Sequence, residues 1–155
     1  MASEVSCTGH SAVKVPAPLI YFAGDGIGAL LAWRWPWTIP VPRWVGVLLI
    51  LLGIGLALWA LQSLSRAHTP VDPAKPSTAL VETGPYRWSR NPIYVAMTVS
   101  SVGLALCLRT VWILALLVVV VLLIDRSVIA PEERYLETTF GAQYDAYRRR
   151  VRRWL

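Results

Sequence analysis

Charged residues and cysteine are both scarce in this chain of 155 residues. Only 15% of the residues are charged and 55% are hydrophobic, with a mean hydropathy of +0.51, whereas a soluble domain carries about 25% charged residues. The two cysteines, Cys7 and Cys107, lie far apart, which excludes a disulfide framework and offers no metal-ligand spacing. The low charge therefore predicts a membrane protein and not a soluble domain.

The N-terminus lacks the pattern of a secretory signal, because no basic region leads into a cleavable apolar core. Residues 1–15 are small and polar and are predicted to be a disordered tail. The net charge is +6, but the basic residues stand at the edges of apolar runs. This placement predicts contact with membrane lipids, and no module that reads nucleic acid is present.

Four apolar runs predict transmembrane helices over residues 16–35, 43–64, 92–108 and 110–127. About 20 helical residues cross the hydrocarbon, where the backbone must satisfy its own hydrogen bonds. Residues 16–155 are therefore expected to form one all-α integral membrane domain. A loop over 65–91 joins the second and third spans, and short amphipathic helices follow over 131–155.

The basic residues predict the orientation of this multi-pass domain. If both termini are cytoplasmic, only Arg34, Arg43 and Arg109 of the 15 basic residues lie outside. Short cytoplasmic segments carry such an excess of Lys and Arg. The 65–91 loop and the C-terminal helices then lie together on the cytoplasmic side.

Several patterns have both a functional and a packing interpretation. The stretch GDGIGA, residues 24–29, matches a dinucleotide-binding fingerprint, but that fingerprint requires a preceding strand, which is not predicted here. Close helix packing is therefore predicted for these glycines. The same is predicted for Gly53 and Ala57, which have small-xxx-small spacing. Asp25 is a candidate functional residue, because an ionisable group inside a span is costly. The alternative is that the span is shifted along the membrane normal until Asp25 lies near an interface. The run Arg148–Arg153 predicts contact with anionic lipid headgroups.

Polar and stiffened residues stand directly before the third apolar run, in the segment TGPYRWSRNPIY, Thr83–Tyr94. Asn91 can cap the following helix, Pro92 can open it, and Arg90 can extend to the headgroups. This structural interpretation explains three residues but not the aromatic residues around them.

Tyr86 and Tyr94 flank these three residues, and a second polar pair, Glu132 and Glu133, follows the fourth run. Both groups lie on one side of the membrane in the expected orientation. A helix start offers free N–H groups, the rings offer π faces, and the glutamates offer negative charge. Together they suit a small zwitterionic ligand that also carries a cationic centre.

The segments TALVETGPYRWSRNPIY and PEERYLETTFGAQYDAYRRRVRRW together resemble the isoprenylcysteine carboxyl methyltransferase and phospholipid methyltransferase family of integral membrane enzymes. The resemblance covers about residues 43–155. It implies that S-adenosylmethionine binds on the cytosolic side, that its methyl group passes to a lipophilic molecule, and that S-adenosylhomocysteine is the product. The cofactor-binding residues that it implies are Leu80, Val81, Tyr86, Arg90, Asn91, Pro92, Tyr94 and Glu132.

The same resemblance suggests how methyl transfer is catalysed. Holding the acceptor in line with the methyl group supplies much of the rate. An amine acceptor needs a base, for which Glu133 or Glu132 is the candidate. A carboxylate acceptor needs an orienting cation, for which Arg126 is the candidate, although Arg126 can instead be an interfacial anchor paired with Asp125. The family's best-known pattern has His at the position of Asn91, so binding and not proton transfer is expected there.

Two other functions stay open. A sterol-reductase-like enzyme that uses NADPH carries a similar Arg-x-Pro-x-Tyr region, and a catalytically silent membrane protein can retain the scaffold for binding or assembly. The sequence does not distinguish a prenylated carboxylate from a phospholipid amine as the acceptor.

We expect a cysteine at the C-terminus to be shielded from the outside of the cell. In a background with Cys7 and Cys107 replaced by Ser, a membrane-impermeant maleimide should label Thr38→Cys in intact cells. Leu155→Cys should react only after permeabilisation, because the basic residues retain that end in the cytoplasm. Labelling of Leu155→Cys in intact cells would refute this orientation.

Overall fold

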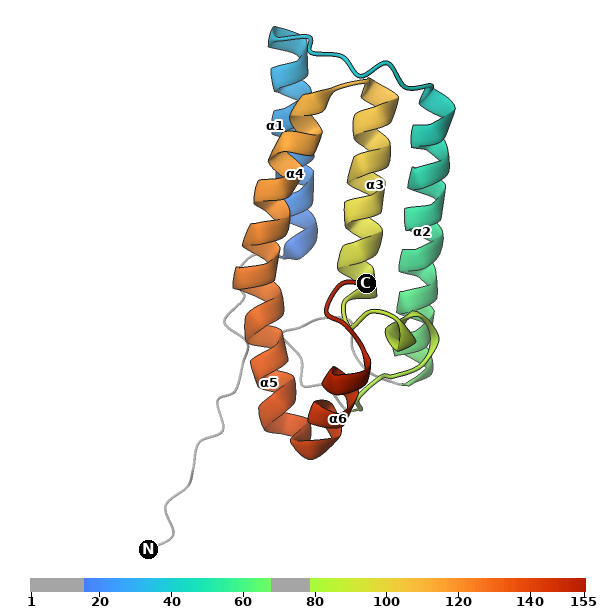
Figure 1. Ribbon diagram of the computed structural model, residues 1–155, viewed down its shortest axis with the longest axis vertical. Helices are drawn as coiled ribbons and strands as arrows, with labels where there is room; N and C mark the ends of the chain where they lie inside the picture. Colours follow the sequence, from blue (N-terminus) through green and yellow to red (C-terminus); the bar gives the residue numbers. More distant parts are fainter. Residues whose placement is uncertain (1–15, 68–78) are drawn as a thin grey trace, which may run out of the picture.

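The computed structural model describes residues 16–67 and 79–155. The predicted tail over 1–15 and the middle of the predicted 65–91 loop lie outside the described residues. Figure 1 shows helices that run up and down in a bundle, with the C-terminal helices at one end. The elements are α1 (Ala17–Arg34), α2 (Arg43–Arg66), the 3₁₀ helix η1 (Gly84–Arg87), α3 (Pro92–Leu108), α4 (Val111–Ile124), the π turn η2 (Asp125–Ile129), α5 (Ala130–Phe140) and α6 (Ala142–Arg150).

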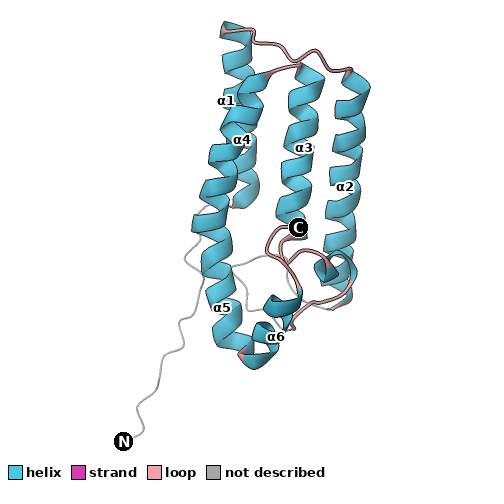
Figure 2. Cartoon of the chain, viewed as in Figure 1, coloured by secondary structure: helices cyan, strands magenta, loops and turns pink. Residues whose placement is uncertain are grey.

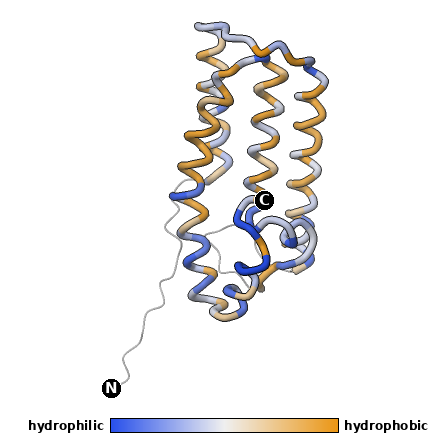
Figure 3. The backbone as a smooth tube through the Cα atoms, viewed as in Figure 1, coloured by the Kyte–Doolittle hydropathy of each residue, from blue (hydrophilic) through white to orange (hydrophobic). Residues whose placement is uncertain are grey.

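The described part of the chain is helical, apart from loops and two isolated bridges, which confirms the all-α prediction (Figure 2). Helix α2 and the continuous run Val111–Phe140 are long and apolar enough to cross a membrane, and α3 is a shorter apolar helix. Large apolar side chains such as Phe22, Leu52 and Val118 are exposed on the bundle surface. Such exposure is typical of a surface that contacts lipid, and Figure 3 shows the hydrophilic residues gathered at the end of the bundle with α5 and α6.

Glycines let the helices of the bundle approach closely, as the sequence predicts. A Cβ atom at Gly28 of α1 would collide with the backbone of Ile113 in α4, and Gly24 packs against the same helix. A Cβ atom at Gly53 of α2 would meet the carbonyl of Ala96 in α3. The glycines of GDGIGA that face α4 therefore serve helix packing.

Polar contacts join α1 to α3 inside the bundle. Ser101 donates a hydrogen bond of 2.9 Å from its Oγ to Oδ2 of Asp25, and the hydroxyls of Tyr21 and Thr98 lie 2.9 Å apart. Asp25 therefore has a hydrogen-bond partner on a neighbouring helix, which satisfies a costly polar group between apolar helices.

The helix that begins at Val111 continues through Pro131, where the sequence predicts the start of a separate helix. The π turn η2 ends two residues before Pro131 and passes into α5 without a break. Proline cannot donate the usual hydrogen bond four residues back, and a wider π turn accommodates that loss while the helix continues. Helix α5 ends at Gly141, whose φ is 48°.

Candidate active site

The last residues of the chain return to the start of α3 and join the two sequence motifs. The backbone N–H of Arg90 donates to the carbonyl of Arg152 at 2.9 Å. The carbonyl of Arg153 accepts from Ser89 Oγ at 3.3 Å and from Asn91 Nδ2 at 3.0 Å. The C-terminal segment, residues 151–155, therefore lies against the loop that leads into α3 (Figure 1).

A buried ion pair connects that loop to α5. Arg90 Nη1 lies 3.1 Å from Glu133 Oε1, and both side chains are only 10% exposed. The same Nη1 donates to the hydroxyl of Tyr144 in α6 at 3.3 Å. Breaking a buried pair by removal of one partner costs about 3–5 kcal/mol, so this contact fixes Arg90 and Glu133 relative to each other.

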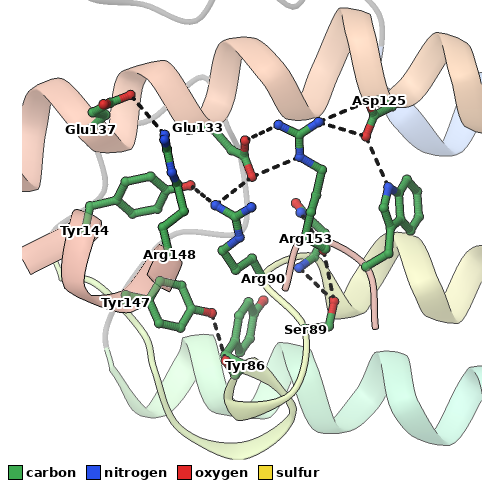
Figure 4. Close-up of polar contacts among 12 residues, drawn as sticks. Tyr86, Ser89, Arg90, Asp125, Glu133, Glu137, Tyr144, Tyr147, Arg148 and Arg153 are labelled. Carbon is green, nitrogen blue, oxygen red and sulfur yellow. Dashed lines mark hydrogen bonds and ion pairs between the residues drawn. The ribbon is translucent and has the colours of Figure 1, made fainter. Parts of the chain in front are cut away.

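Arg153 is a second cation at the same carboxylate, as Figure 4 shows. Its Nε donates to Glu133 Oε1 at 3.2 Å, and its Nη1 lies 3.1 Å from Asp125 Oδ2. Trp154 Nε1 also donates to Asp125, at 3.1 Å. Arg153 is thus engaged within the protein, and contact of the run Arg148–Arg153 with lipid headgroups stays a prediction. No local pattern in the sequence distinguishes Arg153 from the other arginines of its run.

Arg126 lies outside this cluster. Asp125, its proposed partner in the anchor interpretation, pairs with Arg153 instead. Within the described residues, the guanidinium of Arg126 is exposed and has no hydrogen bond or ion pair. The structure therefore does not bring Arg126 together with Glu133.

The adjacent glutamates have different surroundings, because neighbouring helical residues point about 100° apart. Glu132 Oε2 accepts a hydrogen bond of 3.4 Å from the hydroxyl of Tyr94 at the start of α3. Burial raises the pKa of Glu132 to about 7; the bond from Tyr94 opposes this rise, and the charge of Glu133 adds to it. Among the described residues Glu132 therefore has no ion pair, whereas the adjacent Glu133 pairs with Arg90 and Arg153.

The loop before α3 is packed firmly beneath this cluster. Val81 and Tyr86 are buried together, while Leu80 packs against Tyr144 and Tyr147 of α6. Tyr147 donates a hydrogen bond of 2.8 Å from its hydroxyl to the carbonyl of Tyr86. Burial raises the pKa of Tyr86, so its phenol is neutral at physiological pH.

Asn91 and Pro92 stand where the sequence predicts, at the N-cap and at the first residue of α3. The side chain of Asn91 makes no capping hydrogen bond, however, and its amide is directed to the carbonyl of Arg153. The capping interpretation is therefore wrong for the side chain of Asn91, which helps to hold the C-terminal segment.

One buried donor in the cluster lacks an acceptor. Within the described part of the chain, Nε of Arg90 is buried and has no hydrogen-bond partner. A buried polar atom without a partner is costly and rare, and is a feature of sites that complete their bonds with a ligand. An unsatisfied cationic donor and the carboxylate of Glu132 fit the carboxylate and the ammonium of an amino acid group.

Comparison with known families places the chain in one of them. The model of the phospholipid methyltransferase family matches residues 41–143, which is more than half of the chain. The chain therefore belongs to the phospholipid methyltransferase family, a family of membrane methyltransferases, and the resemblance found in the sequence is confirmed.

Two curated relatives share this region. The chain is 31% identical over 115 residues to the nickel-cobalt-cadmium resistance protein NccN of Alcaligenes xylosoxydans xylosoxydans, covering 70% of this chain and 50% of the relative. It is 29% identical over 109 residues to protein-S-isoprenylcysteine O-methyltransferase of Saccharomyces cerevisiae, covering 69% and 46%. The chain thus spans about half the length of the curated relatives it matches.

We expect Glu132→Gln to stabilise the fold at alkaline pH. Between the ordinary glutamate pKa of 4.5 and about 7, the folded protein retains a proton that the unfolded chain has lost. Stability therefore falls as the pH rises through this window. Thermal unfolding in detergent should give Glu132→Gln a higher Tm than the wild type at pH 8, and the difference should shrink at pH 5.

The control is Glu137→Gln, which changes a largely exposed glutamate of the same helix and should not alter the pH dependence. The same change of Tm with pH in the wild type and in Glu132→Gln would contradict the burial of the Glu132 charge.

Proposed function

We propose that the protein is an S-adenosylmethionine-dependent methyltransferase of the membrane, which methylates a lipophilic acceptor at the cytoplasmic face. Membership of a methyltransferase family supports the reaction class. The observation that carries the cofactor assignment is the buried, unpartnered Nε of Arg90 in the same cluster as Glu132.

The proposed binding roles follow from the charges of these groups. Arg90 Nε donates to the carboxylate of the cofactor, and Glu132 accepts from its ammonium. The rings of Tyr86 and Tyr94 offer π faces to a sulfonium, since a cation is attracted to an aromatic face. The remaining proposed lining residues come from the loop and from the start of α3, and they are Leu80, Val81, Asn91 and Pro92.

The cofactor supplies an electrophilic methyl group, and the protein holds the acceptor in line with it. Glu133 is held in ion pairs with two arginines, so its proposed contribution as a base requires release from them. A carboxylate acceptor needs no base, and the geometry therefore supports a carboxylate over an amine. The exposed guanidinium of Arg126 lies outside the cluster and has no partner among the described residues, so its proposed orienting role requires an acceptor that extends beyond the cluster.

We also propose that all four of α1, α2, α3 and α4 cross the membrane. Helices α1 and α3 have 18 and 17 residues, which is near the ~20 that span the hydrocarbon. Flanking residues can compensate for the shorter ones. The cluster around Arg90 then lies at the cytoplasmic end of the bundle, beside membrane lipids that can deliver a lipophilic acceptor.

S-adenosylhomocysteine should bind the detergent-purified protein and raise its Tm, whereas NADPH should not. Glu132→Gln should weaken this binding by about a hundredfold, because a ligand ammonium would lose its buried charged partner. Isothermal titration measures both effects. The control is Arg149→Gln, which changes an exposed arginine of α6 and should leave the affinity unchanged.

Stabilisation by NADPH alone would favour a reductase, and the absence of any effect from either ligand would favour a catalytically silent protein. Transfer of labelled methyl from S-adenosylmethionine into a membrane lipid extract then tests the reaction itself.

A further inference from the structure

Two arginines share the carboxylate of Glu133, and they do so unequally. Arg90 reaches Oε1 through Nη1 at 3.1 Å. Arg153 reaches Oε1 through Nε at 3.2 Å and Oε2 through Nη2 at 2.5 Å. The guanidinium of Arg153 therefore makes the two-point contact with Glu133, and Arg90 makes a single-point contact.

The two-point contact of Arg153 with Glu133 limits how Arg90 can pair with the same carboxylate. Arginine and carboxylate groups pair preferentially through two parallel N–H···O bonds. Arg153 occupies Oε2 and part of Oε1, so Glu133 cannot form such a pair with Arg90. Nε of Arg90 consequently stays without an acceptor among the described residues, although the side chain is only 10% exposed.

Arg153 is itself held in place from several directions. Nη1 of Arg153 donates to the two carboxylate oxygens of Asp125 at 3.1 and 3.3 Å. The backbone carbonyl of Arg153 accepts from the side chains of Ser89 and Asn91. These contacts fix the guanidinium of Arg153 over Glu133 from the side opposite to α6, as the close-up shows (Figure 4).

We propose that Arg153 is a positioning residue that acts through Glu133. By occupying the second oxygen of Glu133, it prevents this carboxylate from capturing Nε of Arg90 and keeps that donor free for the carboxylate of the ligand. This inference rests on the proposed function, and it extends it to a residue beyond the 41–143 region that the family model matches.

The test compares two probes that differ in the group at issue. S-adenosylhomocysteine carries an amino acid carboxylate, and 5′-methylthioadenosine lacks the whole amino acid part. Arg153→Gln should weaken the binding of S-adenosylhomocysteine by about tenfold and that of 5′-methylthioadenosine by less than about twofold, since only the former needs Nε of Arg90. Isothermal titration in detergent measures both.

A double-mutant cycle tests whether Arg153 acts through Glu133. In a Glu133→Gln background, Arg153→Gln should have little further effect on S-adenosylhomocysteine binding, because residues that act as one unit are not additive. The matched control is Trp154→Phe, which removes a hydrogen bond to Asp125 from the same segment without touching Glu133. It should leave both affinities within about twofold of the wild type.

Each result has a distinct meaning. Unchanged binding of S-adenosylhomocysteine to Arg153→Gln overturns the inference and leaves the proposed function intact. Equal weakening of both probes, with additive effects in the cycle, assigns Arg153 a merely structural role and also overturns it. Failure of the wild type to bind S-adenosylhomocysteine overturns the proposed function and this inference together. If Arg153→Gln does not fold, Arg153→Lys gives the same comparison, since a single ammonium leaves one oxygen of Glu133 open to Arg90.

Discussion

The buried ion pair between Arg90 and Glu133 is the contact on which the polar end of the molecule depends. It joins the loop before α3 to α5, two segments that are connected in sequence only through the apolar hairpin of α3 and α4. A buried charge is tolerated only when it is paired and hydrogen-bonded. Each neighbour that packs around this pair, Tyr144 and Arg153 among them, therefore has its position set by the need to satisfy one of these charges.

The π turn explains how one arginine contacts two carboxylates. Asp125 and Glu133 are eight residues apart, which in a regular α-helix places them about 80° apart in rotation. Because the π turn η2 takes up one residue more than an α turn, the eight residues correspond to about two full turns. Both carboxylates then face the C-terminal segment, where Arg153 contacts them. The turn before Pro131 thus shapes the cluster as well as continuing the helix.

The sequence predicts the parts of this fold that local patterns determine. The apolar run over 43–64 forms α2, which continues for two more residues to Arg66. The run over 92–108 forms α3 with the same bounds. The two motifs, with Arg90 in one and Glu133 in the other, are brought together as the resemblance implies. The role of Arg153 and the amide contact of Asn91 could not be predicted. Arg153 contacts Glu133 and Asp125, which lie 20 and 28 positions before it, and Asn91 contacts a carbonyl 62 positions away. A single sequence has no periodic signal for contacts over such separations.

The proposed site depends most on one atom, the buried Nε of Arg90, which is reserved for a ligand carboxylate. The most direct measurement is the arginine ¹⁵Nε–¹H NMR spectrum of the protein in detergent, recorded with and without saturating S-adenosylhomocysteine. The account predicts that the slowly exchanging Nε–H resonance of Arg90 moves downfield when the ligand binds, as a hydrogen bond to a carboxylate requires. An Arg90 resonance that stays unchanged at saturation would contradict it.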